Sequence, residues 1–505
     1  MTSRLDIATD SGIVRGRRDG NVVTWRAVPY AAPPVGDLRL RSPARIAAWT
    51  GIRDAREFRD AALSHPFSSP LGLLRRQRQS EDCLTLNVCA PIDLGAPRPV
   101  LVFVHGGGFF EGSSAWPLYD PRPLVDRGDV VLVSINYRLN AFGFIDFSKY
   151  STPDRPFESN LGLRDQVAAL EWVQRNIAAF GGDPRNVTLF GESAGGASVV
   201  DLMTVPAAEG LFHRVIAQSA PADAVCSPES AAAVADACIA NLGATPETAA
   251  SALQNLSART IVRAALKLLH PMMSQVPGRM PFVPVVDGEF LPEEPLAAFA
   301  NGRAHRVPMI IGTNRNELDL HGRLIDVLPS KDRLIDRMFA ATNPAVQRDI
   351  LAAYEHLPGR PGALQFGTDS FFLRPTLAAC EAHQAYAPTY VYRFDYATPL
   401  LRLTRVGAFH GFELLAVFGV VDKWLPRLLA IGARATFRAV SEETQDHWLS
   451  FAKSGAPLSH WPAYTETERA TLLIDESSRV VCDLDPDIRA ALSTYDGPYR
   501  TLTAG

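Results

Sequence analysis

The chain has 505 residues, of which 47% are hydrophobic and 21% are charged, as in a globular protein that buries a large core. Its 50 lysine and arginine residues nearly balance its 54 aspartate and glutamate residues, so the net charge of −4 gives no general attraction for nucleic acid or an anionic membrane. This composition argues against a disordered chain, and we expect neither nucleic acid nor membrane as a partner.

The start of the chain, residues 1–12, is polar and contains no apolar signal segment. The most apolar stretch, residues 408–421, is too short to span a bilayer and is interrupted by His410 and Glu413. We therefore expect a cytoplasmic protein that does not cross a membrane.

The six cysteines are scattered and include no C-x-x-C pair, so they indicate neither a zinc site nor a redox motif. Free thiols are the expectation for a chain kept in a reducing compartment. Cys226 and Cys238 would close a loop only if the protein were exported.

The first third of the chain alternates short β-rich runs with turns. Expected strands cover residues 22–25, 84–89, 100–105 and 130–136. Residues 161–179 repeat apolar side chains at helical spacing, and the segment 181–184 (GGDP) ends this helix. The next strand is expected at 187–190. Strand, helix and strand in this rhythm predict a parallel sheet with crossover helices.

After Ser219 the chain is alanine-rich and helical as far as Leu269, and short apolar strands are expected at 309–312 and 390–396. The sequence has no repeat of fixed period and no linker rich in proline, glycine or serine that would separate independent domains. We expect one large domain over residues 1–505, with helical insertions.

Ser193 lies in the pattern G-x-S-x-G, residues 191–195, directly after an expected strand and before a run of small residues. In such a nucleophile elbow, a tight turn from strand to helix exposes the serine hydroxyl above the edge of the sheet. Only glycine fits two positions before and after the serine. A turn that merely packs a helix on a strand can carry the same five residues, so a second motif is needed.

The second motif is H-G-G-G at residues 105–108, directly after the expected strand 100–105. Consecutive glycines let several backbone N–H groups turn toward one point, where they bind an oxyanion. In acyl transfer, negative charge develops on the carbonyl oxygen of the transition state, and such donors stabilise it. The two motifs together predict an acyl-transfer enzyme with Ser193 as its nucleophile.

A serine nucleophile needs a histidine to take its proton and an acid to orient that histidine. His410 lies between glycines in an aromatic-rich loop, and Glu317 lies in the loop after the expected strand 309–312. From their positions alone, His447 and Asp319 are alternatives for the two roles.

The chain resembles the type B carboxylesterases, the family of bacterial p-nitrobenzyl esterases, animal carboxylesterases and cholinesterases, along almost its whole length. Beyond the two motifs above, the resemblance rests on 81–87 (EDCLTLN), 136–138 (NYR), 160–166 (NLGLRDQ), 282–288 (FVPVVDG) and 461–462 (WP). It implies an α/β-hydrolase fold, in which helices flank a large, mostly parallel central sheet. It also implies hydrolysis of carboxylic esters.

The resemblance further implies a role for each residue of the site. The catalytic triad would be Ser193, Glu317 as the acid and His410 as the base. The oxyanion hole would consist of the amides of Gly107, Gly108 and Ala194, and Glu192 and Ser219 would support the triad. The charged residues Glu81, Asp82, Arg138 and Asp165 are expected to hold loops through ion pairs rather than to contact substrate.

Departures from the family pattern narrow the range of substrates that we expect. Residues 65–78 contain no tryptophan, whereas enzymes acting on choline esters place one there for cation–π attraction, so a cholinesterase is not favoured. Cys83 matches one half of a family disulfide, but no cysteine precedes it. Gly278 and Met280 stand where acetylcholine-hydrolysing relatives carry two phenylalanines of the acyl pocket, which favours acyl groups longer than acetyl.

The expected function is therefore hydrolysis of small-molecule esters with short- to medium-chain or aryl groups. A binding protein that has lost its nucleophile is the alternative from another class, and the intact Ser193, Glu317 and His410 argue against it. An enzyme for a special linkage, such as a carbamate or a lactone, stays open because fold and triad do not determine the leaving group. No metal is implied, and residues 191–196 do not match the G-x-G-x-x-G pattern of nucleotide or flavin sites, so no cofactor is expected.

Overall fold

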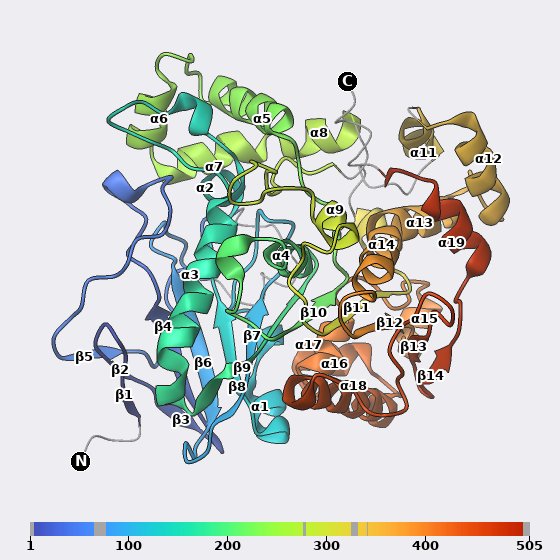
Figure 1. Cartoon of the computed structure of the whole chain (residues 1–505), viewed down its shortest axis with the longest axis horizontal. Coiled ribbons are helices and arrows are strands. Elements are labelled where there is room, and N and C mark those ends of the chain that lie inside the picture. The colour runs from blue at the N-terminus through green and yellow to red at the C-terminus, as the bar shows by residue number, and fades with distance from the viewer. Residues whose placement is uncertain (1–4, 65–76, 276–278, 325–331, 341, 498–505) are drawn as a thin grey trace.

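The computed structural model describes residues 5–64, 77–275, 279–324, 332–340 and 342–497. Within these residues, eleven strands form one sheet that crosses the molecule (Figure 1). In spatial order they are β14 (Arg479–Val481), β13 (Thr471–Ile474), β12 (Thr389–Phe394), β11 (Met309–Asn314), β10 (Arg214–Gln218), β9 (Gly182–Glu192), β7 (Arg98–Val104), β8 (Val131–Ile135), β6 (Thr85–Pro91), β4 (Val22–Pro29) and β3 (Arg17–Asp19).

The strands from β13 to β8 run parallel, and antiparallel strands complete the sheet at both edges. A separate three-stranded sheet near the N-terminus contains β1 (Asp6–Ala8), β2 (Ile13–Arg15) and β5 (Ile52–Asp54). Every expected strand is confirmed, and most extend beyond their expected ends. The periodicity of the sequence marked the apolar centres of these strands rather than their limits.

The sheet is covered on both faces, which explains why its central strands are almost continuously apolar. Along β7, Val100, Val102 and Val104 belong to one core, which also contains residues of the helices α3 (Leu161–Asn176) and α4 (Ala194–Leu202). The alternate residues Leu101 and Phe103 belong to a second core, on the other face. Side chains that alternate between two cores are what a strand buried on both faces requires.

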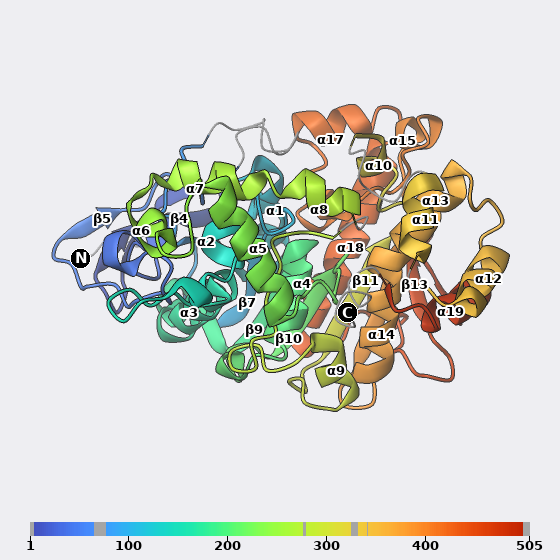
Figure 2. The same ribbon diagram turned by 90° about the horizontal axis from the view of Figure 1, so that it is seen from above.

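Helices account for the crossovers and the insertions. The remaining helices are α1 (Arg122–Gly128), α2 (Asn140–Phe144), α5 (Pro228–Asn241), α6 (Ala249–Asn255), α7 (Ala258–Leu266), α8 (Leu269–Gln275), α9 (Pro295–Ala300), α10 (His321–Leu324), α11 (Asp332–Phe339), α12 (Pro344–Ala353), α13 (Arg360–Thr368), α14 (Arg374–His383), α15 (Pro399–Leu403), α16 (Glu413–Val417), α17 (Trp424–Leu429), α18 (Arg434–Ser454) and α19 (Pro486–Ser493). The expected helical region after Ser219 corresponds to α5–α7, and α8 begins where that region was expected to end. Helices α5–α8 gather at the top of Figure 1, and in Figure 2 α5–α7 lie on the left with α8 near the middle.

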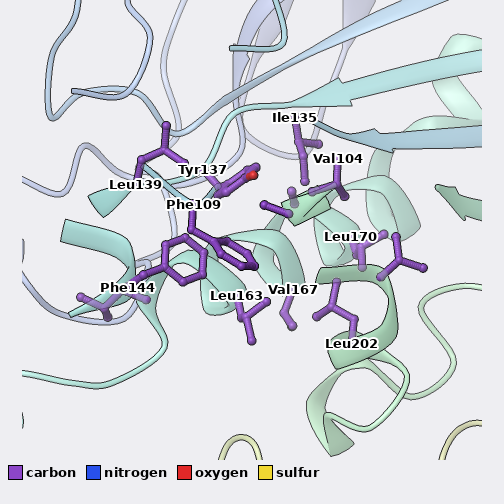
Figure 3. Close-up of a cluster of buried hydrophobic side chains, with 14 of the residues drawn as sticks. Val104, Phe109, Ile135, Tyr137, Leu139, Phe144, Leu163, Val167, Leu170 and Leu202 are labelled. Carbon is purple, nitrogen blue, oxygen red and sulfur yellow. The ribbon is translucent and has the colours of Figure 1, made fainter. Parts of the chain in front are cut away.

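Apolar packing holds the end of β7 against the helices α3 and α4. Figure 3 shows Leu163 and Val167 of α3 and Leu202 of α4 in one cluster with Val104 and Phe109. Val104 ends β7, and Phe109 follows the three glycines at 106–108. This cluster therefore anchors the glycine-rich loop beside the start of α4.

Neither a membrane-spanning helix nor a disulfide is present among the described residues. No helix in the described ranges has both the length and the apolar character that crossing a bilayer requires. All six cysteines are free thiols, and Cys226 and Cys238 are therefore not joined.

Candidate active site

Ser193 occupies a sharp turn between β9 and α4. Its backbone has φ 59° and ψ −125°, a strained conformation for a residue with a side chain. A Cβ atom on Gly195 would lie 2.1 Å from the carbonyl oxygen of Val104, and one on Gly191 would lie 2.4 Å from the carbonyl oxygen of Gly195. Only glycine fits either position, so the turn has the geometry of a nucleophile elbow.

The glycine-rich loop after β7 presents backbone donors near this turn. Gly107 has φ 115°, and a Cβ atom there would lie 2.2 Å from the carbonyl oxygen of Glu111, so the position excludes other residues. In the described part of the chain, the N–H groups of Gly107, Gly108 and Ala194 donate no hydrogen bond. Three such unused amides are the donor set that an oxyanion requires.

His105 and Tyr137 fix the base of the glycine-rich loop. The Tyr137 hydroxyl donates a hydrogen bond to the carbonyl oxygen of His105 at 2.6 Å, and the two rings stack with centroids 4.5 Å apart. Both side chains are buried. The loop is therefore held by its first residue while its glycines remain free to bind.

His410, which is partly exposed, is joined to the buried Glu317. Nδ1 of His410 lies 2.6 Å from Oε2 of Glu317, whose other oxygen accepts the backbone N–H of Asn314 at 2.7 Å. The Glu317 side chain is fully buried. The two loops that carry the pair are tied together because the N–H of Asn316 donates to the carbonyl oxygen of Ala408 at 3.0 Å.

Glu192 brings a second carboxylate to the histidine. Its Oε1 lies 3.3 Å from Nε2 of His410, and its Oε2 lies against Gly106, where a Cβ atom would also meet Cβ of Ser193 at 3.0 Å. Glu192 thus lies between the serine turn and the histidine. The Ser193 hydroxyl has no hydrogen bond within the described residues. Hydrogen bonds between a nucleophile and its base are often long or absent without substrate, and they tighten when substrate binds.

The charges around His410 are strongly coupled. Burial lowers the pKa of His410, but the charges of Glu192 and Glu317 outweigh burial and raise it to about 9. Burial raises the pKa of Glu192 to about 7, against the attraction of His410. The site therefore holds a readily protonated imidazole beside a carboxyl group whose own pKa is raised by burial.

Sequence reasoning gave Glu413 no role in this site. Its side chain is fully buried, and it accepts hydrogen bonds from the side-chain amides of Asn314 and Gln218. Burial, together with the charges of Glu192 and Glu317, raises the pKa of Glu413 to about 8. The signal was an ionisable residue in the apolar stretch 408–421, three positions after His410.

His321 was also missed. Its ring lies 5.6 Å from that of His410, edge to face, and burial together with the charge of His410 lowers the pKa of His321 to about 4. Phe372 contacts the His410 ring as well, with centroids 4.8 Å apart. These contacts come from distant segments that no local pattern joins to His410.

The structure separates the two alternatives from the site. Asp319 accepts a long hydrogen bond of 3.4 Å from Asn316 and lines a different cavity, together with Arg323 and Arg360. His447 lies within α18, where its ring contacts His460 and Trp461. Neither forms the histidine and carboxylate pair that His410 and Glu317 form.

The structure places only some of the residues predicted to support the triad or to line the acyl pocket. Ser219 is buried and follows β10, but its hydroxyl has no hydrogen-bond partner in the described residues, so its supporting role stays a prediction. Met280 lies against the glycine-rich loop, because its Cε is 2.8 Å from the place a Cβ atom on Gly108 would take. Gly278 lies outside the described residues.

The charged residues expected to hold loops do so, with one exception. Arg138 and Asp165 form a buried bidentate ion pair, with Nη2 and Oδ1 2.6 Å apart. Arg39 pairs with Glu81 at 2.7 Å. Asp82 is exposed and forms no ion pair with the described part of the chain.

A mostly parallel sheet with helices on both faces and a nucleophile elbow between β9 and α4 defines the α/β-hydrolase class. Solved structures agree with this assignment. A p-nitrobenzyl esterase structure superposes with a TM-score of 0.88 at 35% identity, over 97% of this chain and 99% of that one.

Sequence comparisons identify the family. A family model described as the carboxylesterase family matches residues 3–489. The para-nitrobenzyl esterase of Bacillus subtilis is 36% identical over 504 residues, covering 96% of this chain and 97% of that protein. The fumonisin B1 esterase of Sphingopyxis macrogoltabida is 35% identical, covering 90% and 84%. The chain belongs to the carboxylesterase family, and it is a hydrolase of carboxylic esters.

Proposed function

We propose that the protein hydrolyses small carboxylic esters through a covalent acyl-enzyme on Ser193, with His410 as general base and Glu317 as the orienting acid. The observation that carries this proposal is the 2.6 Å contact between His410 and the buried Glu317, beside a strained serine turn. A carboxylate on Nδ1 holds the imidazole in the tautomer whose Nε2 accepts a proton.

The reaction proceeds in two halves. His410 takes the proton of the Ser193 hydroxyl while Oγ attacks the ester carbonyl carbon, and the amides of Gly107, Gly108 and Ala194 bind the resulting oxyanion. The tetrahedral intermediate collapses, the carbon–oxygen bond to the alcohol breaks, and His410 protonates the leaving alcohol. Water then attacks the acyl-enzyme by the same route and releases the acid and Ser193.

The substrates we propose are esters with short- to medium-chain or aryl groups. Met280 beside Gly108 would place a flexible side chain next to the bound acyl group, where it can repack around different shapes. One relative is named for a para-nitrobenzyl ester, which supports acceptance of an aromatic alcohol.

We further propose that residues 1–505 form one domain, in the cytoplasm. A single sheet includes both β3 near the N-terminus and β14 near the C-terminus, so early and late parts of the chain share one core layer. Six free thiols support a reducing compartment.

The deciding experiment labels the nucleophile. A phosphonylating reagent should add one group, on Ser193, as located by peptide mass spectrometry, and should abolish hydrolysis of p-nitrophenyl esters. Ser193→Ala should lower kcat by at least about 10³-fold and prevent labelling. The exposed Ser251→Ala serves as control and should behave as wild type. A label on another residue, or wild-type turnover in Ser193→Ala, would refute the mechanism.

A further inference from the structure

Three side chains of metal-binding type meet in the C-terminal part of the chain, outside the site around Ser193. Glu443 and His447 lie four residues apart on α18, so they project from the same face of that helix. His460 follows in the loop after α18. One ligand atom from each of the three lies within 4.8 Å of the others. Helix α18 is at the lower right of Figure 1.

His447 points to a missing partner at this place. Its side chain is fully buried, yet neither ring nitrogen has a hydrogen-bond partner within the described residues. The rings around it, His460 at 4.9 Å and Trp461 at 5.1 Å between centroids, do not satisfy those nitrogens. A buried polar group without a partner destabilises the folded chain, so a ligand that bonds to the imidazole would relieve this cost.

We propose that Glu443, His447 and His460 bind one Zn²⁺ ion. Two imidazoles and one carboxylate are a common three-ligand set for zinc, and water completes the tetrahedron. The exposed position of His460 leaves the ion open to that water. Mg²⁺ and Ca²⁺ prefer oxygen ligands, so the two imidazoles disfavour them.

An outer contact orients the carboxylate of this site. The Ser478 hydroxyl donates a hydrogen bond to Oε2 of Glu443 at 2.9 Å, from the turn between β13 and β14. Partners of this kind fix the direction of a metal ligand and strengthen binding. The ion would therefore join α18 to the loop after it, with support from the edge of the large sheet.

We expect the bound ion to stabilise the folded chain rather than to take part in catalysis. An ion that binds the folded chain and not the unfolded one stabilises the folded state. The helix that would bind the ion also contacts the network beside the active site, since Trp448 donates to Oε1 of Gln218 at 3.2 Å and Gln218 donates to Glu413. Zinc would thus stabilise the helix on which that network rests, and it has no part in the acyl transfer proposed above.

The test is calorimetric titration of the full-length, chelator-treated protein with Zn²⁺. Wild type should bind one ion at a site that Mg²⁺ does not occupy. Glu443→Gln and His460→Ala should weaken binding by at least about tenfold, because each loses one of three ligands, and Ser478→Ala should weaken it by about 10- to 100-fold. The exposed Glu442→Gln and His356→Ala, which make the same chemical changes elsewhere, should bind as wild type.

Thermal unfolding gives the second readout. Zn²⁺ should raise the Tm of wild type and of both controls, and should leave the Tm of Glu443→Gln nearly unchanged. Both ligand variants keep the buried His447, and their Tm without metal shows whether they fold. If either is unfolded, Ser478→Ala decides. Absence of Zn²⁺ binding in wild type, or wild-type affinity in the folded variants, would overturn the proposal.

Discussion

The charges of three buried carboxylates act on the imidazole of His410, and we expect them to determine when it can serve as the proposed base. Glu192 and Glu317 contribute most to the raised pKa of His410, and Glu413 contributes less. A general base must be unprotonated, so a pKa of about 9 disfavours the active form at neutral pH. Removing a negative charge destabilises the imidazolium and lowers this pKa.

We therefore expect Glu192→Gln to move the acidic limb of the kcat/KM profile toward lower pH by about one unit. Glu413→Gln should shift it in the same direction and by less, because Glu413 is the smaller influence on His410. The surface change Glu442→Gln is the control. The profile should be measured from pH 5 to 10 with a p-nitrophenyl ester, and an unmoved limb in Glu192→Gln would show that Glu192 does not raise the histidine pKa.

The choice between two neighbouring acids is testable at the same scale. Glu317→Gln removes the charge that stabilises the imidazolium and can fix the wrong tautomer, so kcat should fall by about 10³- to 10⁴-fold. Asp319→Asn should change kcat by no more than a few fold, since Asp319 does not contact His410. Comparable losses in both variants would mean that the acid is misassigned.

Some residues of the candidate site could be predicted from local sequence motifs, and others could not. The serine turn and the glycine-rich loop are short motifs whose backbone demands are local, so residues 191–195 and 105–108 could be proposed as nucleophile and oxyanion sites from spacing. His410 and Glu317 needed the family resemblance, because their contact joins segments far apart in the chain. His321 was missed for the same reason, since its place beside His410 depends on tertiary packing.

At the scale of elements, the turn from β9 to α4 places Ser193 beside the amide of Ala194, which we propose as an oxyanion donor. The close approach of Gly195 to the carbonyl oxygen of Val104 means that β7 and α4 meet backbone to backbone. Patterns of apolar residues predicted these strands and this helix. They could not predict that contact, which depends on how the elements dock.

Gly195→Ala should force the two elements apart, because its Cβ would lie 2.1 Å from a backbone oxygen that cannot rotate away. We expect a loss of about 1–3 kcal/mol in the free energy of unfolding. The kcat value should also fall, since Ser193 and the amide of Ala194 move with the start of α4. Urea unfolding and ester hydrolysis measure the two effects. The control Gly95→Ala, in an exposed loop, should change neither the free energy of unfolding nor kcat. If Gly195→Ala also changes neither quantity, the turn can relax around the added methyl group.

For the whole molecule, buried ionisable groups make stability depend on pH. Burial raises the pKa of Asp369 to about 7, against a hydrogen bond from Tyr354 and the charge of Arg393, with Asp485 raising it further. The folded pKa exceeds the unfolded value near 3.8, so the folded state holds this proton more tightly. Stability is therefore lost as pH rises from about 4 to about 7 and then levels off.

Asp369→Asn keeps an acceptor for Tyr354 and removes the charge. Relative to wild type, the variant should gain about 2 kcal/mol between pH 5 and pH 8, measured by urea unfolding at both values. The exposed Asp154→Asn should show no such pH-dependent difference. If instead the free energies of unfolding of Asp369→Asn and wild type differ by the same amount at pH 5 and pH 8, Asp369 is charged in the folded state throughout this range.

We expect substrate size to depend on the space beside the glycine-rich loop. Met280 contacts that loop beside Gly108, and Gly278 precedes it without a side chain, so we expect room for acyl chains longer than acetyl. Each methylene buried in such a pocket contributes about 0.8 kcal/mol, roughly fourfold in binding. The kcat/KM values for p-nitrophenyl esters should rise from acetate to butyrate or hexanoate and fall for longer chains.

Filling the space should reverse this order. Gly278→Phe adds a ring where relatives that hydrolyse acetylcholine carry one, and it should favour acetate over hexanoate by penalising long chains. Gly95→Phe, in an exposed loop and without a positive φ, is the control and should keep the wild-type order. Circular dichroism should confirm that both variants fold. If the native enzyme prefers acetate and Gly278→Phe leaves that preference unchanged, residues 278 and 280 do not line the acyl site, and the walls of the pocket must come from other parts of the chain.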